Sequence, residues 1–173
     1  MILESIEIIT DFLDSGGDVL RAIFGTTLLL WLFIIERGVF FQFRLPEVLK
    51  ENTDKWNNRK DRKSWFAHRV RECQLSQLGQ ELNKNIFFIK TLVAVCPLLG
   101  LLGTVTGMIA VFDVMAMTGT GNARSMASGI SMATIPTMAG MVAALSGLYF
   151  GNLFEQKAKK FKVIAEEQMQ LEV

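Results

Sequence analysis

Apolar residues gather along this chain into three long blocks, separated by segments that are short or strongly charged. Within the second and third blocks, residues 91–112 and 125–154 carry no charge at all. An α-helix rises about 1.5 Å per residue, so about 20 apolar residues cross a hydrocarbon core about 30 Å thick. The pattern predicts an all-α integral membrane protein with three transmembrane helices, at 21–43, 91–117 and 125–154.

The segments outside these blocks also have helical patterns. Residues 1–20 alternate apolar and acidic positions, which favours a short amphipathic helix on the membrane surface; a frayed acidic terminus is the alternative. Residues 44–90 predict a helical loop, and residues 118–124 a tight turn. Residues 155–173 predict a helical tail that packs against the loop. One apolar stripe marks this tail: Phe154, Ala158, Phe161 and Ala165.

Two helices are predicted within the 44–90 loop. Pro46 suits the first turn of a helix, where its missing N–H costs nothing, and a second helix is expected from Ser64 onward. Five residues at helical spacing predict that the second helix runs straight into the second span: Leu75, Leu78, Leu82, Ile86 and Ile89. At the end of the first span, Glu36 and Arg37 can pair or reach the membrane interface.

Charge predicts the orientation in the membrane. Residues 1–20 contain five acids and no Lys or Arg, whereas residues 44–90 contain eleven Lys or Arg. The tail opens with four lysines, Lys157, Lys159, Lys160 and Lys162. Because Lys and Arg concentrate on the cytoplasmic side, the loop and tail are expected inside the cell and the N-terminus outside the membrane. The basic loop is interpreted as a solvated face beside anionic lipid, not as a nucleic-acid site.

The second and third spans are rich in small and hydroxyl-bearing residues. Small residues let membrane helices approach closely, so Gly103-x-x-x-Gly107 and Gly147-x-x-x-Gly151 are interpreted as packing faces. Most hydroxyls are expected to bond a carbonyl of their own helix. The alternative is that some line a narrow polar path or touch a partner helix. Six hydroxyls are the candidates: Thr104, Thr106, Ser128, Ser131, Thr134 and Thr137.

The residues needed for enzyme or metal chemistry are scarce. His68 is the single histidine, and Cys73 and Cys96 are the only cysteines, so no metal site, cofactor or catalytic constellation is predicted. The second and third spans contain no side chain that titrates near neutral pH. Any proton carrier in mid-membrane must therefore come from another chain.

Two motifs resemble a known family. CPLLGLLGTVTGM at 96–108 is similar to the second-span signature of the ExbB/TolQ/MotA proton-channel family, nearest its ExbB branch. The third span follows the pattern of that branch without a gap, at Gly129-Ile130, Thr137, Gly140, Ala143-Ala144 and Asn152. The resemblance is to a compact variant of ExbB.

This resemblance implies a ring-forming homo-oligomer, a pentamer, in the bacterial inner membrane. The ring would enclose an ExbD-like single-span dimer that supplies a mid-membrane aspartate. It would drive a TonB-like transducer for outer-membrane import of iron-siderophore complexes and vitamin B12. Thr104 and Thr137 fall on the pore-lining threonines of the family. The full set expected to line the pore or contact the partner is Gly103, Thr104, Gly107, Ser131, Met132, Thr134, Thr137 and Gly140.

The chain departs from the family pattern at two places. Met132 stands where the family has a glutamate, so a channel carboxylate on this subunit is absent. Ser146 replaces a proline and Pro136 precedes the threonine, which predicts a displaced kink in the third span; a second kink is predicted at Pro97. Met132 keeps open the alternative of a membrane scaffold that conducts nothing. A TolQ-like role in envelope integrity is the other alternative.

The predicted orientation can be tested with a topology reporter fused after Asn58. We expect a cytoplasmic signal from this fusion, because the positive charge of the loop holds it inside. The same reporter placed in the 118–124 turn serves as the control and should give a periplasmic signal. An external signal from the Asn58 fusion would overturn the three-span topology.

Overall fold

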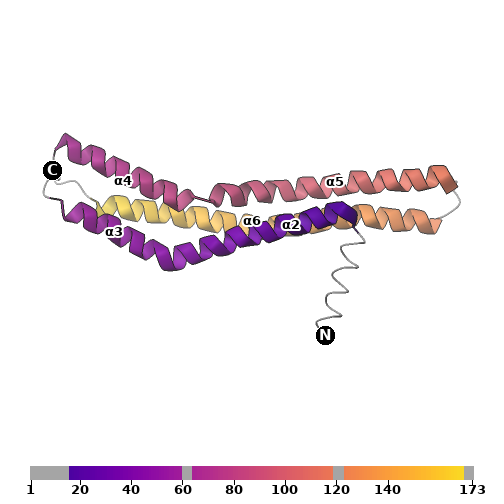
Figure 1. Ribbon diagram of the computed structural model, residues 1–173, viewed down its shortest axis with the longest axis horizontal. Helices are drawn as coiled ribbons and strands as arrows, with labels where there is room; N and C mark the ends of the chain where they lie inside the picture. The colour runs from indigo at the N-terminus through magenta and orange to yellow at the C-terminus, as the bar shows by residue number, and fades with distance from the viewer. Residues whose placement is uncertain (1–15, 60–63, 119–122, 170–173) are drawn as a thin grey trace, which may run out of the picture. The chain divides into compact units, whose positions relative to one another are not determined.

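A computed structural model describes residues 16–59, 64–118 and 123–169, and every element in these ranges is a helix (Figure 1). In chain order they are α2 (Gly17–Val39), the π-helical turn η1 (Phe40–Arg44), α3 (Leu45–Asn57), α4 (Trp65–Asn83), α5 (Ile86–Thr118) and α6 (Ala123–Gln168). Three helical stretches, which contain α2, α5 and α6, are long and apolar enough to cross a membrane. The prediction of an all-α fold with three spans is confirmed. Residues 1–15 of the predicted amphipathic segment and most of the 118–124 turn lie outside the described residues, and residues 17–20 of that segment belong to α2.

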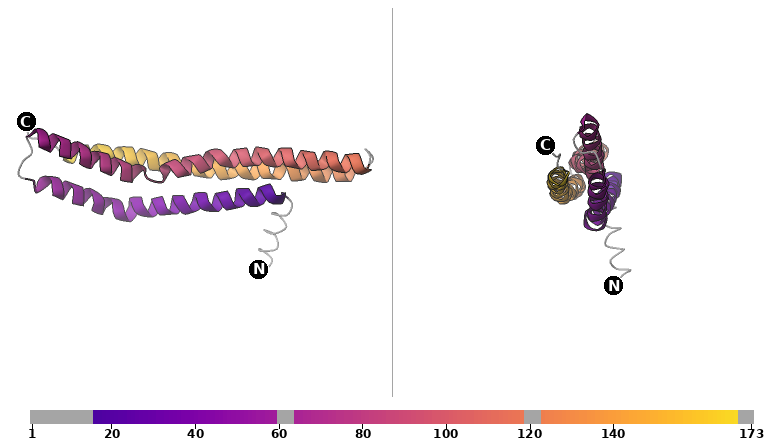
Figure 2. Two further views of the ribbon diagram at one scale, coloured as in Figure 1. Left: turned by 45° about the horizontal axis from the view of Figure 1, so that its top comes forward. Right: turned by 90° about the vertical axis from the view of Figure 1, so that its left-hand side faces the viewer.

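The chain divides into two compact units. The membrane unit comprises residues up to Trp31 together with Lys90–Leu148, and the second unit comprises Leu32–Ile89 and the residues from Tyr149 onward. In the membrane unit α5 and α6 form an antiparallel hairpin, and their ribbons lie side by side in Figures 1 and 2. The buried residues there are mostly of small or medium size, among them Ile23, Leu30, Cys96, Val111, Ala133, Ala143 and Ala144.

Large apolar side chains of the membrane unit point outward. On α2, Phe24, Leu28 and Leu29 are each about half exposed, and α5 and α6 expose Leu, Val, Ile and Met in the same way. Exposed apolar area on this scale is unfavourable in water and favourable against lipid or another transmembrane helix. This unit is therefore built to contact a bilayer and further helices.

The second unit packs α3, α4 and the C-terminal half of α6 together. The five predicted apolar residues of the loop are all buried, and so are Phe154, Ala158 and Ala165 of the predicted tail stripe. The rings of Phe41 and Phe154 stack with centroids 5.7 Å apart. At the end of α6, the guanidinium of Arg71 donates to the carbonyl oxygens of Glu166 and Met169. These carbonyls have no partner within the helix, so Arg71 satisfies the negative end of α6.

The helix of the first span does not end where the loop begins. α2 continues through η1 into α3, and the backbone N–H of Leu45 donates to the carbonyl of Phe40, five residues earlier. Pro46 lies in the first turn of α3, as predicted. A proline ring clashes with the carbonyl four residues before it, and the wider π turn relieves this conflict without breaking the helix.

The prediction that α4 runs straight into the second span is wrong. The helix stops at Asn83 and a new one begins at Ile86, because Asn85 has φ 62°, in the left-handed region. Two adjacent residues of α2 bond the residues at this break. Glu36 accepts a hydrogen bond from Nδ2 of Asn85 at 2.6 Å, and Nη1 of Arg37 donates to the carbonyl of Glu81 at 3.2 Å. The sequence left open whether Glu36 and Arg37 pair or reach the membrane interface, and helical periodicity does not indicate their contacts with Asn85 and Glu81.

Arg37 is buried, with 1% of its surface exposed, and its guanidinium lies 4.7 Å from the centroid of the Phe40 ring. Glu81 belongs to the last turn of α4, and that turn contains no basic residue of its own. A cation beside the final carbonyls of a helix is stabilising. Arg37 therefore supplies from α2 the positive charge that α4 lacks.

The backbone of Asn85 can be tested by comparing Asn85→Ala with Asn85→Gly. Both variants lose the side-chain bond to Glu36, so their difference isolates the left-handed conformation. Alanine in this conformation costs about 1–2 kcal/mol, whereas glycine adopts it freely. We expect the alanine variant to be less stable than the glycine variant by about 1 kcal/mol, measured by denaturant unfolding in detergent. Equal midpoints would contradict the left-handed assignment.

Candidate functional site

The contact between α5 and α6 is a seam with almost no side chains in it. A methyl group added at Gly140 would lie 2.5 Å from the carbonyl oxygen of Cys96, and one added at Gly100 would lie 2.9 Å from the Cα of Thr137. Carbon atoms do not approach other heavy atoms so closely, so both positions require glycine. The two helix backbones therefore touch directly in mid-span.

The same seam accommodates the unusual proline of α6. Pro136 is buried, and a methyl group at Gly103 would lie 2.5 Å from its Cβ. One turn further out, Gly107 faces Ala133, with 2.6 Å between an added methyl group and the Cα of Ala133. The interpretation of Gly103-x-x-x-Gly107 as a packing face is confirmed. Gly100 was not among the predicted site residues, although its three-residue spacing from Gly103 could have indicated it.

Most of the hydroxyls in the seam region bond their own helix, as expected. Thr104 donates to the carbonyl of Leu101 at 2.7 Å, Thr106 to that of Leu102 at 3.1 Å, and Thr134 to that of Ile130 at 3.2 Å. Thr137 is different, because its Oγ1 donates across the seam to the carbonyl of Gly100 at 3.0 Å.

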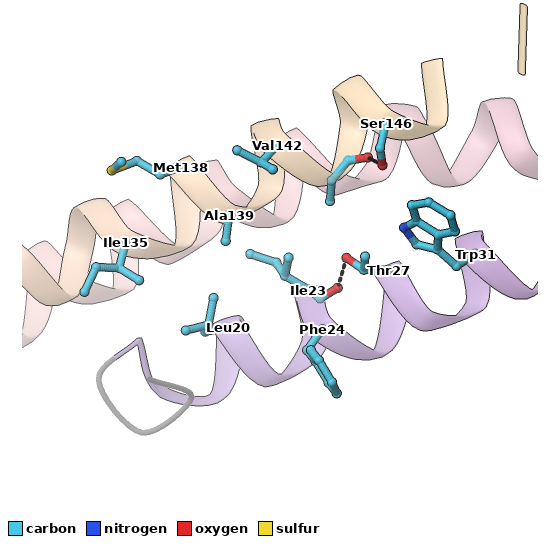
Figure 3. A pocket seen from close by; sticks show the side chains of 11 residues that line it. Leu20, Ile23, Phe24, Thr27, Trp31, Ile135, Met138, Ala139, Val142 and Ser146 are labelled. Atoms are coloured by element: carbon cyan, nitrogen blue, oxygen red, sulfur yellow. Dashed lines mark hydrogen bonds between the residues drawn. The ribbon is translucent and has the colours of Figure 1, made fainter. Parts of the chain in front are cut away.

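An apolar groove of about 600 Å³ separates α2 from α6 in the membrane unit (Figure 3). Figure 3 shows Leu20, Ile23 and Thr27 of α2 facing Ile135, Ala139 and Val142 of α6. The hydroxyls at this groove are already bonded within their own helices, since Thr27 donates to Ile23 and Ser146 to Ala143, each at 2.7 Å. The groove therefore offers an apolar surface.

A second, smaller apolar groove lies on another side of the hairpin. Its lining comes from α5 and α6 alone: Val93, Pro97, Met141, Ala144, Leu145 and Leu148. We call this side of the hairpin the far face, because no α2 residue lines it. Residues seven apart in a helix share one face. Thr104 is seven residues after Pro97, Thr137 seven before Ala144 and Thr134 seven before Met141, so all three belong to the far face.

The predicted site residues thus divide into three groups. Gly103, Gly107 and Gly140 lie in the seam, and Thr104, Thr134 and Thr137 lie on the far face. Ser131 and Met132 are exposed and lie on the α2 side of α6, since they precede Met138 and Ala139 of the first groove by seven residues. Contact of these residues with a pore or partner stays a prediction.

The two prolines of the spans lie inside unbroken helices, Pro97 in α5 and Pro136 in α6. Each lacks the N–H that would bond the carbonyl four residues earlier, so a main-chain acceptor is freed in each span. The predicted kinks stay predictions. No group of three metal-ligating side chains occurs within the part of the chain that the structure describes.

Comparison with known proteins decides the family. The family model described as MotA/TolQ/ExbB proton channel family matches residues 43–167, which is more than half of the chain. This chain belongs to the MotA/TolQ/ExbB proton channel family. The matched residues include the seam, the far face and most of the second unit.

Individual relatives carry ExbB names. A putative biopolymer transport protein ExbB-like 3 of Synechocystis is 38% identical over 87 residues, 49% of this chain and 41% of the relative. Biopolymer transport protein ExbB of Salmonella typhimurium is 31% identical over 91 residues, 53% of this chain and 37% of the relative. The ExbB of Aquifex aeolicus is 29% identical over 85 residues, 49% of this chain and 57% of the relative. The aligned parts thus span only about two fifths to three fifths of these relatives.

The seam can be tested with Gly140→Ala, for which Gly25→Ala is the matched control. The alanine methyl at 140 would meet the Cys96 carbonyl, whereas nothing lies within 4 Å of a methyl at Gly25 on α2. We expect Gly140→Ala to destabilise the protein by about 1–3 kcal/mol through overpacking. Gly25→Ala should be neutral or stabilising by up to about 1 kcal/mol. Unfolding in detergent measures both, and equal stability of the two variants would contradict the seam.

Proposed function

We propose that this chain is the proton-channel stator subunit of an ExbB–ExbD–TonB-like motor in the bacterial inner membrane. A ring of identical subunits, five by resemblance, encloses the membrane helices of an ExbD-like dimer. The motor couples the proton motive force to a TonB-like transducer and so to outer-membrane import of iron-siderophore complexes and vitamin B12. The observation that supports this proposal best is the far face, where three threonines line up on an uncharged, tightly packed hairpin.

The chemistry of the far face suits a partner that carries the proton. A threonine hydroxyl that donates to its own helix, as Thr104 does, keeps lone pairs that accept a hydrogen bond. A protonated carboxyl group of a partner helix can donate to such an oxygen. An unpaired charge at the centre of a bilayer costs about 3 kcal/mol or more, so hydroxyls along its path lower the barrier to moving it. In this proposal the chain contributes the hydroxyls that line the path, and the partner contributes the carboxyl group that titrates.

Met132 bears on the alternative of a scaffold that conducts nothing. This residue replaces the glutamate that the resemblance places in the third span, yet it lies on the α2 side of α6 and not on the far face. The substitution therefore leaves the three threonines of the far face in place. This division favours a conducting subunit over a passive scaffold, with the proton carried by the partner alone.

The proposed orientation follows from charge. The second unit contains the basic loop and the lysine-rich start of the tail, so we place it in the cytoplasm and the α5–α6 turn in the periplasm. A TolQ-like role uses the same channel chemistry with a different transducer. Co-purification with candidate single-span partners, followed by mass measurement of the complex, separates the two roles and gives the number of subunits.

The far face can be tested by replacing Thr104 with valine, with Thr106→Val as the matched control. Thr106 is nine residues from Pro97 and so lies on the opposite side of α5, and it also bonds its own helix. Losing one hydrogen bond worth about 1 kcal/mol should slow proton-driven iron uptake about fivefold in Thr104→Val. Thr106→Val should retain the rate of the unmodified protein. Equal rates for both variants would refute the assignment of the far face to the proton path.

A further inference from the structure

The hydroxyl of Thr137 makes a hydrogen bond between two helices, whereas four other hydroxyls of the membrane unit bond within their own helix. Thr104, Thr106, Thr134 and Ser146 all donate to carbonyls three or four residues back in their own helices. Thr137 donates instead from α6 to the Gly100 carbonyl of α5, 37 positions away in the sequence. Its hydroxyl proton is therefore engaged in holding the hairpin together.

The acceptor of this bond lies on the turn of α5 that carries Thr104. In an α-helix the carbonyl of residue 100 also accepts from the backbone N–H of residue 104, so the Gly100 oxygen has two donors. A carbonyl oxygen has two lone pairs and can accept both. The bond thus links Thr137 directly to the helical turn on which the Thr104 hydroxyl is mounted.

Close contacts on both sides of this bond leave the two helices little freedom to slide. Toward one end of the seam Pro136 rests against Gly103, and toward the other Gly140 rests against the Cys96 carbonyl. These contacts resist separation of the helices and limit sliding, but they are not directional and leave small axial shifts open. The directional bond from Thr137 to Gly100 supplies a fixed point along the axis.

We propose that Thr137 is a positioning residue that sets the axial register of α6 against α5, and thereby places Thr104 relative to Thr134 on the far face. This assignment rests on the proposed function and gives the threonines of the far face different tasks. Thr104 and Thr134 can reorient their hydroxyls without disturbing the hairpin, because their bonds stay within one helix. Thr137 cannot release its proton to a partner without loosening the seam.

A disulfide across the seam tests this task. Val111 and Gly129 face each other near the outer end of the hairpin, and a Cβ at Gly129 would lie 3.4 Å from the Cβ of Val111. Disulfide-bonded cysteines have Cβ atoms about 3.5–4.5 Å apart, so a shift of about 0.1 Å or more lets Val111→Cys and Gly129→Cys form a bond that fixes the register. Cys73, which is exposed, is replaced by serine so that its thiol does not compete, while Cys96 is buried.

Proton-driven uptake is measured for three forms of this paired-cysteine protein: one that retains Thr137, one with Thr137→Val and one with Thr137→Ser. Each form is assayed with the cysteines reduced and with them oxidised. Each rate is divided by that of the paired-cysteine protein that retains Thr137, in the same redox state. Reduced Thr137→Val should be about three to ten times slower, and Thr137→Ser within twofold, because serine keeps the hydroxyl. Oxidation should bring Thr137→Val to within twofold. A Thr137→Val rate that stays low after oxidation would overturn the proposal, since the hydroxyl would then act in the proton path itself.

A second measurement is independent of transport. Thr137→Val should lower the melting temperature of the detergent-solubilised protein relative to Thr137→Ser, and the disulfide should remove that difference. Equal melting temperatures of Thr137→Val and Thr137→Ser without the disulfide would overturn the positioning role. Absence of proton-driven uptake in the unmodified protein with every candidate partner would refute the proposed function, and the melting comparison would still decide the task of Thr137.

Discussion

Direct contact between the backbones of α5 and α6 is the constraint on which the membrane unit depends. Gly100, Gly103 and Gly140 leave no room for a side chain between the helices, and Pro136 and the Cys96 carbonyl occupy the space that glycine provides. In a bilayer there is no hydrophobic drive between helices, so such close packing and the hydrogen bonds it permits supply the cohesion. Everything apolar and large can then point outward, toward lipid or other subunits.

In the second unit, side chains from neighbouring helices bond the polar groups at helix ends. Two arginines from neighbouring helices satisfy carbonyls that no N–H within the helix can reach, Arg37 at the end of α4 and Arg71 at the end of α6. Glu36 holds Asn85, whose left-handed backbone separates α4 from α5. These four polar side chains therefore terminate and join helices within the second unit.

Separation of the polar residues onto different faces of the hairpin connects the fold to the proposed function. Thr134 and Thr137 of the far face and the α2-side residue Met132 lie on different sides of α6, although they are close in sequence. A methionine at position 132 therefore bears on one side of the helix and leaves the other side unchanged. The proposed proton path on the far face takes its titrating group from a partner, because the second and third spans contain no charged side chain between residues 91 and 112 or 125 and 154.

The sequence by itself determined the fold class, the three spans, the helical loop and tail, and the family, because long uncharged blocks and a glycine-proline signature are local patterns. It also indicated that glycines would pack helices together. Only the tertiary structure decided which carbonyl each hydroxyl bonds: Thr134 donates within α6, whereas Thr137 donates to Gly100 of α5 because the two backbones approach closely there. The break at Asn85 was likewise decided by contacts with α2, 49 positions away, which no periodicity within the loop can encode.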